Sequence, residues 1–254
     1  MAARWSTEIA HYVRTKTMNS LPTLRTECAL TVIMPVLNEA AWMRAALGAL
    51  APLINRGAQV VVVDGGSTDA TLATALALRS PAISLINALP GRASQMNAGA
   101  KQAAGQVLLF LHVDTVLPSD ADVLILKALA SGSHVWGRFD VRIEGKSRWL
   151  PVVATLMNLR SRATGIATGD QAIFMTRAAF AALSGYCNQP LMEDIDMSRR
   201  LRQLSPPACL RTRVVTSGRR WETRGVWRTI VLMWRLRFAY WRGTAPERLA
   251  QLYR

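Results

Sequence analysis

The chain has 254 residues, half of them hydrophobic, and a formal net charge of +15 at pH 7. This composition excludes a disordered protein, and the length suits one α/β domain with a full hydrophobic core. The three cysteines, Cys28, Cys187 and Cys209, are widely spaced and odd in number. They therefore predict ordinary thiols in a reducing compartment rather than a disulfide framework or a metal site.

The excess positive charge lies mostly in the last quarter of the chain. Residues 199–254 contain fourteen arginines, no lysine and two acids, which gives a net charge of +12. Such an excess favours an anionic partner, which can be a phosphate-bearing substrate, an anionic lipid or a nucleic acid.

Neither a signal peptide nor a membrane span is predicted. Residues 1–27 mix charged and polar side chains without an apolar core, which indicates a loosely ordered extension, and Met18 is a candidate for the true start. The best candidate span, residues 226–241, is shorter than the ~20 residues that a span needs and contains three arginines. We expect a cytoplasmic protein whose C-terminal helices can also contact the inner face of the membrane.

The first half of the chain alternates between strand and helix patterns, with glycine or proline between them. We expect strands over residues 29–34, 59–63, 83–86 and 107–111, and helices over residues 39–50, 69–79, 94–104 and 120–130. Asn38 is expected to cap the first of these helices, and Gly105 to end the third.

The second half mixes the two patterns. Residues 135–144 alternate apolar and polar side chains, which predicts a half-exposed strand that is antiparallel or at an edge. We expect further strands over residues 171–175 and 210–215, and helices over residues 149–162, 176–183, 192–204 and 224–242. A capping box at residues 244–247 opens a short final helix.

This order of elements predicts one α/β domain with a largely parallel sheet over residues 28–218. Residues 219–254 are then basic amphipathic helices that pack on the domain or on a membrane surface. Arg224, Arg228, Arg235 and Arg242 form a basic stripe there, and apolar side chains cover most of the rest.

The apolar strand over residues 107–111 ends in His112, Asp114 and Thr115. In an open α/β sheet the ends of the strands form the crevice where ligands bind. A carboxylate and an imidazole at that edge can hold a metal or a substrate. An exposed strand end is the alternative interpretation.

Residues 64–69, Asp-Gly-Gly-Ser-Thr-Asp, lie between a buried strand and a helix. Their glycines let the backbone approach a ligand, the helix N-terminus favours anions, and Asp64 can accept hydrogen bonds from a base or ribose. The spacing matches neither a dinucleotide fingerprint nor a P-loop, and a polar turn is the alternative.

Two further stretches carry candidate chemistry. Arg92 precedes a helix of small residues, where Arg92 and Asn97 can point into the crevice and the arginine can grip phosphate; a surface arginine is the alternative. Glu193, Asp194 and Asp196 open another helix. They either stabilise its positive end or project one carboxylate into the crevice as a general base.

Six stretches, in order, resemble the motifs of the family 2 glycosyltransferases, which have the GT-A fold. They are residues 35–39, 62–69, 92–99, 111–114, 169–177 and 193–194. The sequences of residues 91–99 and 110–115 resemble those of a small bacterial subgroup labelled radical-SAM/selenodomain-associated glycosyltransferases.

The resemblance implies inverting transfer of a sugar from a nucleotide diphosphate, with UDP as the expected nucleotide, to an unidentified small-molecule or lipid acceptor. Asp194 would be the general base, with Glu193 as the second choice. The implied nucleotide-sugar site consists of Pro35, Leu37, Glu39, Asp64, Gly66, Arg92, Asn97, Val113 and Asp114. The implied acceptor or sugar pocket consists of Gly169, Asp170, Gln171, Arg220 and Trp221.

The resemblance also implies Mn²⁺ or Mg²⁺, which an acid-x-acid motif holds on the diphosphate to screen the leaving group's charge. By position, Asp114 is the metal ligand and His112 replaces the first acid of the motif. No histidine follows His134, so the C-terminal metal-binding histidine of some GT-A enzymes is missing. The basic C-terminal segment can supply charge stabilisation instead.

Two other function classes fit parts of the sequence. A nucleotidyltransferase-like enzyme would share a similar sheet, although the acidic helix start at Glu193 argues against it. A basic module for nucleic acid or membrane would use the C-terminal charge and leave the crevice vestigial. The leading interpretation is the glycosyltransferase, for which no nucleic-acid partner is expected.

Overall fold

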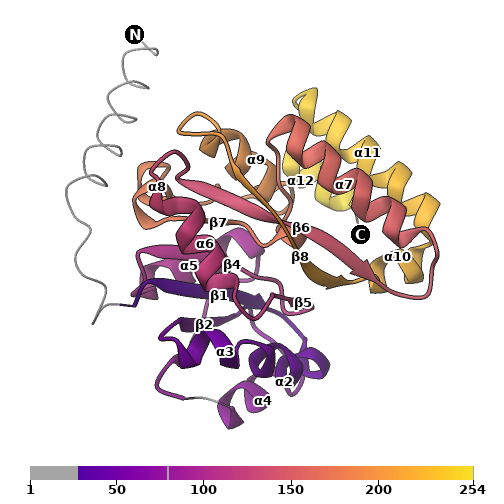
Figure 1. The fold of residues 1–254 in the computed structure, drawn as a ribbon. Coiled ribbons are helices and arrows are strands. Elements are labelled where there is room, and N and C mark those ends of the chain that lie inside the picture. The colour runs from indigo at the N-terminus through magenta and orange to yellow at the C-terminus, as the bar shows by residue number, and fades with distance from the viewer. Residues whose placement is uncertain (1–27, 79, 254) are drawn as a thin grey trace.

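The computed structural model describes residues 28–78 and 80–253, so the extension expected over residues 1–27 and the candidate start at Met18 lie outside the described residues. The described chain folds around one eight-stranded sheet in the order β3-β2-β1-β4-β7-β6-β8-β5 (Figure 1). Its strands are β1 (Leu30–Val36), β2 (Gln59–Asp64), β3 (Ile83–Asn87), β4 (Val107–Phe110), β5 (Thr115–Val116), β6 (Trp136–Glu144), β7 (Phe174–Thr176) and β8 (Ala208–Ser217).

Helices cover both faces of this sheet. Those of the first half are α2 (Ala40–Ala49), α3 (Ala51–Asn55), α4 (Thr71–Ala77), α5 (Arg92–Gln102) and α6 (Ala121–Ala130). Those of the second half are α7 (Leu150–Thr164), the 3₁₀ turn η1 (Gly169–Gln171), α8 (Arg177–Ala182), α9 (Glu193–Leu201), α10 (Arg219–Arg224), α11 (Val226–Trp241) and α12 (Pro246–Tyr253).

The first four strands form the expected parallel core. β1 pairs in parallel with both β2 and β4, and β2 pairs in parallel with β3. Successive residues of these strands are buried on both faces, one set against α2 and α3 and the other against α5. The long apolar runs therefore form a doubly covered sheet, as their composition predicts.

The second half extends the sheet with mixed directions. β7 is antiparallel to β4 and to β6, β6 is parallel to β8, and β5 returns to the far edge beside β8. β6 is antiparallel to β7, which confirms one of the two alternatives expected for it, and it lies in the interior of the sheet rather than at an edge. Its polar residues Arg138 and Asp140 form a buried ion pair, and Arg162 of α7 also binds Asp140 at 2.6 Å. The alternation therefore has two causes: Arg138 and Asp140 pair in the interior, whereas Arg142 and Glu144 are exposed as the pattern predicts.

Several element boundaries also differ from expectation. Asn38 does not cap α2: its backbone has a φ of 55°, and its Oδ1 accepts a hydrogen bond from the Thr68 N–H at 2.8 Å. Helix α5 ends at Gln102, ahead of Gly105, and the strand expected to begin at Gln171 begins at Phe174. Each difference arises where a side chain bonds to a distant segment.

The long helix expected over residues 224–242 is α11, and an additional short helix, α10, precedes it across Gly225. This glycine has a φ of 80°, in the region that other residues rarely adopt, and it separates α10 from α11. Leu236 of α11 and Leu249 of α12 bury themselves against Met192, at the start of α9. Figure 1 shows α7, α11 and α12 side by side at one end of the molecule. Within the described residues, no helix is both long and apolar enough to span a bilayer.

Candidate functional site

A cavity of about 810 Å³ opens where the ends of β1 and β4 meet the helices α7 and α11. The residues after β1 and β4 form its sheet side, the starts of α9 and α10 form its flanks, and α7 and α11 form the opposite wall. The expected site residues that line it are Pro35, Leu37, Glu39, Arg92, His112, Val113, Asp114, Gly169, Asp170, Glu193, Asp194, Arg220 and Trp221. The volume is in the range of small-molecule binding sites.

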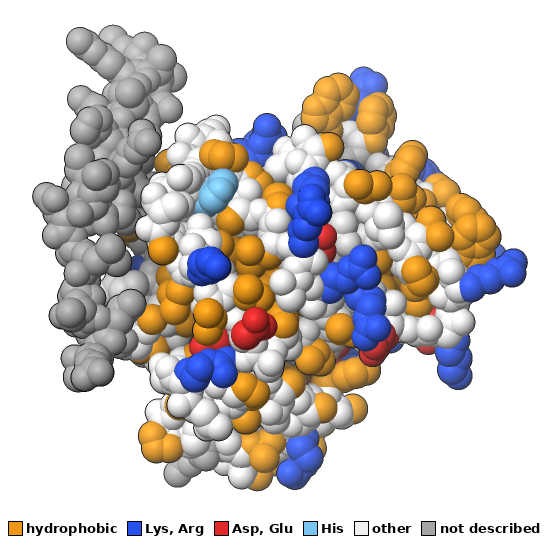
Figure 2. Space-filling view, in the orientation of Figure 1, with side chains coloured by type: hydrophobic (Ala, Val, Ile, Leu, Met, Phe, Trp, Pro, Cys, Tyr) orange, Lys and Arg blue, Asp and Glu red, His pale blue; other side chains and the backbone are white. Residues whose placement is uncertain are grey.

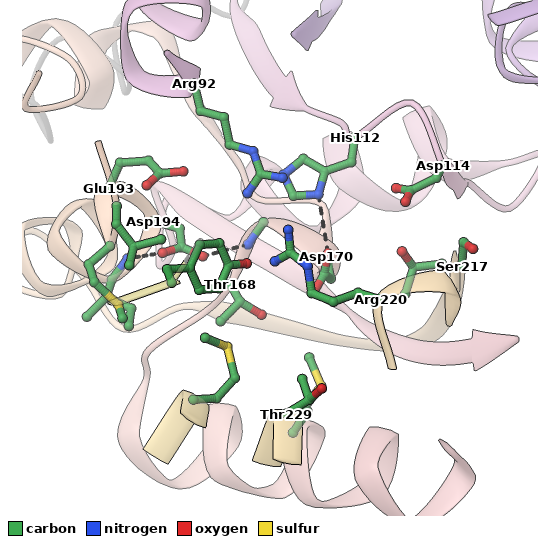
Figure 3. A pocket seen from close by; sticks show the side chains of 18 of the residues that line it. Arg92, His112, Asp114, Thr168, Asp170, Glu193, Asp194, Ser217, Arg220 and Thr229 are labelled. Atoms are coloured by element: carbon green, nitrogen blue, oxygen red, sulfur yellow. Dashed lines mark hydrogen bonds and ion pairs between the residues drawn. The ribbon is translucent and has the colours of Figure 1, made fainter. Parts of the chain in front are cut away.

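His112 and Asp170 form a pair in the middle of the cavity (Figure 3). The Nδ1 of His112 lies 3.2 Å from Asp170 Oδ1. Burial acts to raise the pKa of Asp170, but the hydrogen bond from His112 and the charges of His112, Arg92 and Arg220 lower that pKa to about 2. The Asp170 carboxylate is therefore ionised throughout the physiological pH range.

Gly169 allows this pair to form. A Cβ added at Gly169 would overlap the imidazole ring of His112, so any larger residue would displace the ring or η1. The Gly169 N–H also donates to Asp194 Oδ2 at 2.9 Å. This one glycine thus connects the end of β4 with the carboxylate at the start of α9.

Glu193 and Asp194 face the cavity from the first turn of α9 (Figure 3). Glu193 is buried, and Asp194 is half-buried. Burial raises the pKa of the Glu193 carboxyl, and the adjacent charge of Asp194 raises it further, while Arg92 opposes the shift. Two neighbouring carboxyls in different environments are suited to different protonation states.

Arg92 and Arg220 approach the His112–Asp170 pair from opposite sides (Figure 3). Burial and the nearby charge of Arg92 lower the pKa of Arg220, against the charge of Asp170. The guanidinium of Arg220 also lies over the ring of Tyr253, at 4.6 Å from its centroid. Two converging guanidinium groups suit a ligand with several negative oxygens, because each can donate two parallel hydrogen bonds.

Arg219 connects two of the expected donor-site acids. Its Nη1 and Nη2 donate to Glu39 at 2.9 and 2.6 Å, and its Nε lies 3.2 Å from Asp114 Oδ2. The guanidinium also stacks over Trp42, 5.4 Å from the ring centroid. Arg219 thereby orients both carboxylates at the cavity rim.

Four of the expected site residues do not line the cavity. Asp64 is 1% exposed, and its carboxylate accepts the N–H groups of Gly66 and Ser67, at 2.8 and 2.9 Å, so it shapes the 64–69 turn. Asn97 does not point into the crevice as expected: its side chain exchanges two hydrogen bonds with the backbone of Tyr186. Gln171, the last residue of η1, is fully buried, and its side chain accepts a hydrogen bond from the Thr168 N–H.

The wall made by α7 and α11 carries two arginines that the sequence analysis missed, Arg160 and Arg237. Burial, together with the charge of Arg237, lowers the pKa of Arg160 to about 10. Burial also lowers the pKa of Arg237, against the charges of Asp194 and Asp170. Helical spacing carried a signal for both: Val153, Met157 and Arg160 follow one face of α7, as Ile230, Met233 and Arg237 follow one face of α11.

The described residues do not assemble a complete metal site. No group of three or more histidine, cysteine or acidic side chains is positioned to hold a cation among the residues that the structure describes. The Asp114 carboxylate faces the cavity, whereas His112 directs Nδ1 at Asp170. This donor set fits a cation of the Mg²⁺ type, which is often held by one or two carboxylates with phosphate oxygens and water as the other ligands.

The chain is similar to one sequence family and to several solved structures. The family model described as Glycosyl transferase family 2 matches residues 31–184. No curated protein matches the chain.

Three solved structures show the same fold at low sequence identity. A mannosyltransferase from Pyrobaculum calidifontis, PcManGT in complex with GDP-Man and Mn²⁺, has a TM-score of 0.61 and 20% identity, and the match covers 99% of this chain and 77% of that one. S. aureus TarS 1–349 in complex with UDP has a TM-score of 0.60 and 17% identity, and the match covers 74% and 60% of the two chains. Glucosyl-3-phosphoglycerate synthase from Mycobacterium tuberculosis has a TM-score of 0.54 and 17% identity, with 80% and 74% covered. The match thus spans only about three fifths of the TarS fragment.

Proposed function

The chain belongs to glycosyltransferase family 2, and on that premise we propose that it transfers a sugar from a nucleotide-diphosphate sugar, with UDP as the expected nucleotide, to an acceptor hydroxyl with inversion. The observation that carries this proposal is the convergence of Arg92, Arg220 and Asp114 with the carboxylates of α9 in one cavity. The structural relatives include complexes with UDP and GDP-Man, which supports a nucleotide-sugar donor.

The sheet side of the cavity is proposed as the donor site. Pro35 at the end of β1, with Leu37 and Glu39 just after it, flanks a space for the nucleoside. Arg92 and Arg220 bind the diphosphate through charged hydrogen bonds. Asp64 contributes indirectly, because it fixes the turn at Gly66 whose neighbour Ser67 binds the Asn38 N–H at 2.9 Å. In this proposal the 64–69 turn supports the donor loop after β1.

Asp194 is the proposed general base. The acceptor hydroxyl oxygen forms a bond to the anomeric carbon, the bond from that carbon to the diphosphate oxygen breaks, and the proton passes to Asp194. The Gly169 N–H fixes one oxygen of this carboxylate. Arg92 and Arg220 stabilise the diphosphate as it leaves with the electron pair.

A divalent cation would be held by Asp114 together with the donor's phosphate oxygens. When bound, it would act as a Lewis acid that offsets charge on the leaving group. The metal assignment rests on Asp114, because the Nδ1 of His112 is engaged by Asp170 and its Nε2 lies against Gly169. If a chelator leaves donor turnover unchanged, the assignment to Asp114 fails.

The proposal is tested by Asp194→Asn in the full chain, with release of UDP from a panel of UDP-sugars as the readout. Loss of the base is expected to lower turnover by about 10²- to 10⁴-fold while UDP binding is retained. Asp120→Asn, at an exposed helix start, is the matched control and should leave turnover unchanged. Full turnover in Asp194→Asn would contradict the proposal. A wild type without turnover that binds nucleic acid in a salt-sensitive way would also contradict it, if Asp114→Ala and Asp194→Ala keep that binding.

We also propose that the outer face of α7 and α11 lies on an anionic membrane surface. Trp227, Val231, Trp234, Phe238 and Trp241 recur at intervals of four and three residues, and all five are exposed, Trp241 to 80%. The exposed stripe of α7 consists of Trp149, Val152, Leu156 and Leu159. The rings of Trp149 and Trp227, 5.1 Å apart, join the two stripes. Figure 2 shows hydrophobic side chains gathered at this end of the molecule, with arginine or lysine among them.

The charges around this apolar face favour a lipid surface over a second copy of the chain. Arg228, Arg235 and Arg242 are exposed on α11, and neither α7 nor α11 contains an acidic residue. Two such faces would repel each other, whereas anionic headgroups would bind them. Sedimentation with vesicles of phosphatidylcholine and phosphatidylglycerol should retain the wild type and lose the Trp234→Ser/Trp241→Ser variant. A concentration-dependent dimer without vesicle binding would overturn this assignment.

A further inference from the structure

The α7–α11 wall of the cavity contains charge that the protein itself does not satisfy. The Nε and Nη2 atoms of Arg160 are buried and have no hydrogen-bond partner among the described residues. Buried donors of a charged group are costly to leave unpaired, so most proteins satisfy them. Arg237, half-buried on the facing helix, adds a second positive charge to the same wall.

The surroundings of this pair do not neutralise it. Arg138, the next arginine in the vicinity, is engaged by Asp140, and its charge also acts against Arg160. Asp194 is the carboxylate whose charge acts favourably on both Arg160 and Arg237. The other side chains on this wall are apolar apart from the Thr229 hydroxyl: Val153, Leu156, Met157, Leu159, Thr229, Ile230, Met233 and Trp234. Two guanidinium groups therefore project from an apolar wall next to the proposed base.

We propose that Arg160 and Arg237 form an anion site for the acceptor, which carries a phosphate or a similar anionic group close to the hydroxyl that reacts. The assignment of this anion to the acceptor rests on the proposed function, whereas the existence of the anion site does not. The donor diphosphate has its own cations, Arg92 and Arg220, which face the His112–Asp170 pair. Arg160 and Arg237 both feel the charge of Asp194, and Arg237 also feels that of Asp170. Their wall therefore faces the proposed base, beside which the acceptor hydroxyl must lie.

The same wall indicates on which side the rest of a bound acceptor extends out of the cavity. Leu156, Leu159 and Trp234 line the cavity and are also 56%, 58% and 70% exposed. The mouth on this side therefore opens into the apolar face of α7 and α11. The anionic group can belong to a lipid headgroup that enters from that face, or to a small phosphorylated metabolite, and both sources offer the same chemistry to Arg160 and Arg237.

The test is a titration of inorganic phosphate into the full-length protein already saturated with UDP and Mn²⁺, followed by calorimetry. Wild type should bind phosphate, and Arg160→Gln and Arg237→Gln should each weaken that binding by about tenfold or more. Arg44→Gln, an exposed arginine on α2, is the matched control and should bind as wild type does. Arg160→Lys keeps the charge and should restore part of the affinity, which separates loss of the anion site from loss of the fold.

A second arm distinguishes the two sources. Vesicles of phosphatidylcholine with phosphatidic acid are compared with vesicles that contain an equal charge of phosphatidylglycerol. If wild type prefers phosphatidic acid and Arg160→Gln/Arg237→Gln loses that preference, the anionic group belongs to a lipid. If wild type binds both kinds of vesicle equally and the variant loses only the binding of free phosphate, the acceptor is soluble.

The proposal is overturned if UDP-saturated wild type binds no phosphate, or if both glutamine variants bind it as tightly as wild type. If UDP itself fails to bind, the proposed function fails. The phosphate titration without UDP, in Arg92→Ala as background, still reports on the Arg160–Arg237 site.

Discussion

The two walls of the cavity differ in how they treat charge. On the sheet side, Arg219 binds Glu39 and Asp114, and His112 pairs with Asp170. On the α7–α11 side, Thr229, Arg160 and Arg237 are the polar side chains on a mostly apolar wall, and Arg160 has buried donors without a partner among the described residues. The charged groups of the sheet wall are thus paired before any ligand arrives, whereas the Arg160 donors on the helical wall gain their partner from a ligand. Preorganised groups are the ones expected to stabilise a transition state.

The largest effect expected on the sheet wall itself is on nucleotide affinity. Arg92→Ala and Arg220→Ala should each weaken UDP binding by about 10- to 100-fold, because a hydrogen bond to a charged group contributes roughly 1.5–3 kcal/mol. Binding of uridine, which lacks the diphosphate, should be unchanged. Calorimetry measures both ligands, and Arg44→Ala, exposed on α2, serves as the control. Equal losses for UDP and uridine would place these arginines outside the diphosphate site.

A second prediction tests the packing that connects the sheet wall to α9. Gly169→Ala should lower stability by about 1–3 kcal/mol, because the added methyl group overlaps the imidazole of His112. Gly48→Ala is the matched control: an added Cβ meets nothing within 4 Å in the last turn of α2, so it should stabilise the helix slightly. Thermal unfolding reports both changes. An unchanged Tm in Gly169→Ala would mean that the contact with His112 is loose.

The pH dependence of stability tests whether the His112–Asp170 pair exists in solution. The pKa of Asp170, about 2 in the fold, is below the 3.8 of an unperturbed aspartate. The stabilisation is therefore complete above pH 4 and is lost as the pH falls from about 4 to about 2. Asp170→Asn should flatten the unfolding free energy over this window relative to wild type. Parallel pH profiles of the two proteins would contradict the pairing.

The smallest expected effect concerns Glu193, whose pKa is shifted in the opposite direction from that of Asp170. Because its pKa is raised in the fold by burial and by Asp194, the folded state holds this proton longer than the unfolded chain does. Stability should therefore fall as the pH rises through the unfolded pKa toward the raised value. Glu193→Gln should raise the Tm at pH 8 and leave it nearly unchanged at pH 4. A lower Tm at pH 8 would indicate that the ionised carboxylate is stabilised instead.

Local patterns predicted the sheet wall because strand ends converge at one edge. The apolar runs before Pro35 and His112 predict buried strands, and parallel neighbours place their following residues together. The positions of Asp64 and Asn97 could not be read in this way. Asn97 bonds the backbone of Tyr186, whose proximity depends on the folded chain. Asp64 bonds the N–H of Gly66 in a local turn, which competes with the ligand contact expected for it.

The helical wall was harder to predict for a different reason. Arginine on an amphipathic helix usually lies on the face in contact with water, as Arg228 and Arg235 do. The residue type alone therefore predicts an exposed position for Arg237 as well. Arg160 and Arg237 follow the inward spacing instead, and only the structure shows that α7 and α11 face the same cavity.

The most direct test of the account is a thermal-shift measurement of UDP and GDP, with and without Mn²⁺, on wild type, Arg92→Ala and Arg160→Gln. A ligand that binds the folded state alone raises its Tm. The account predicts that a nucleotide diphosphate stabilises wild type and Arg160→Gln, and that Arg92→Ala loses most of the shift. The absence of any shift in wild type, or a shift lost in Arg160→Gln but kept in Arg92→Ala, would contradict the assignment of the sheet wall to the donor.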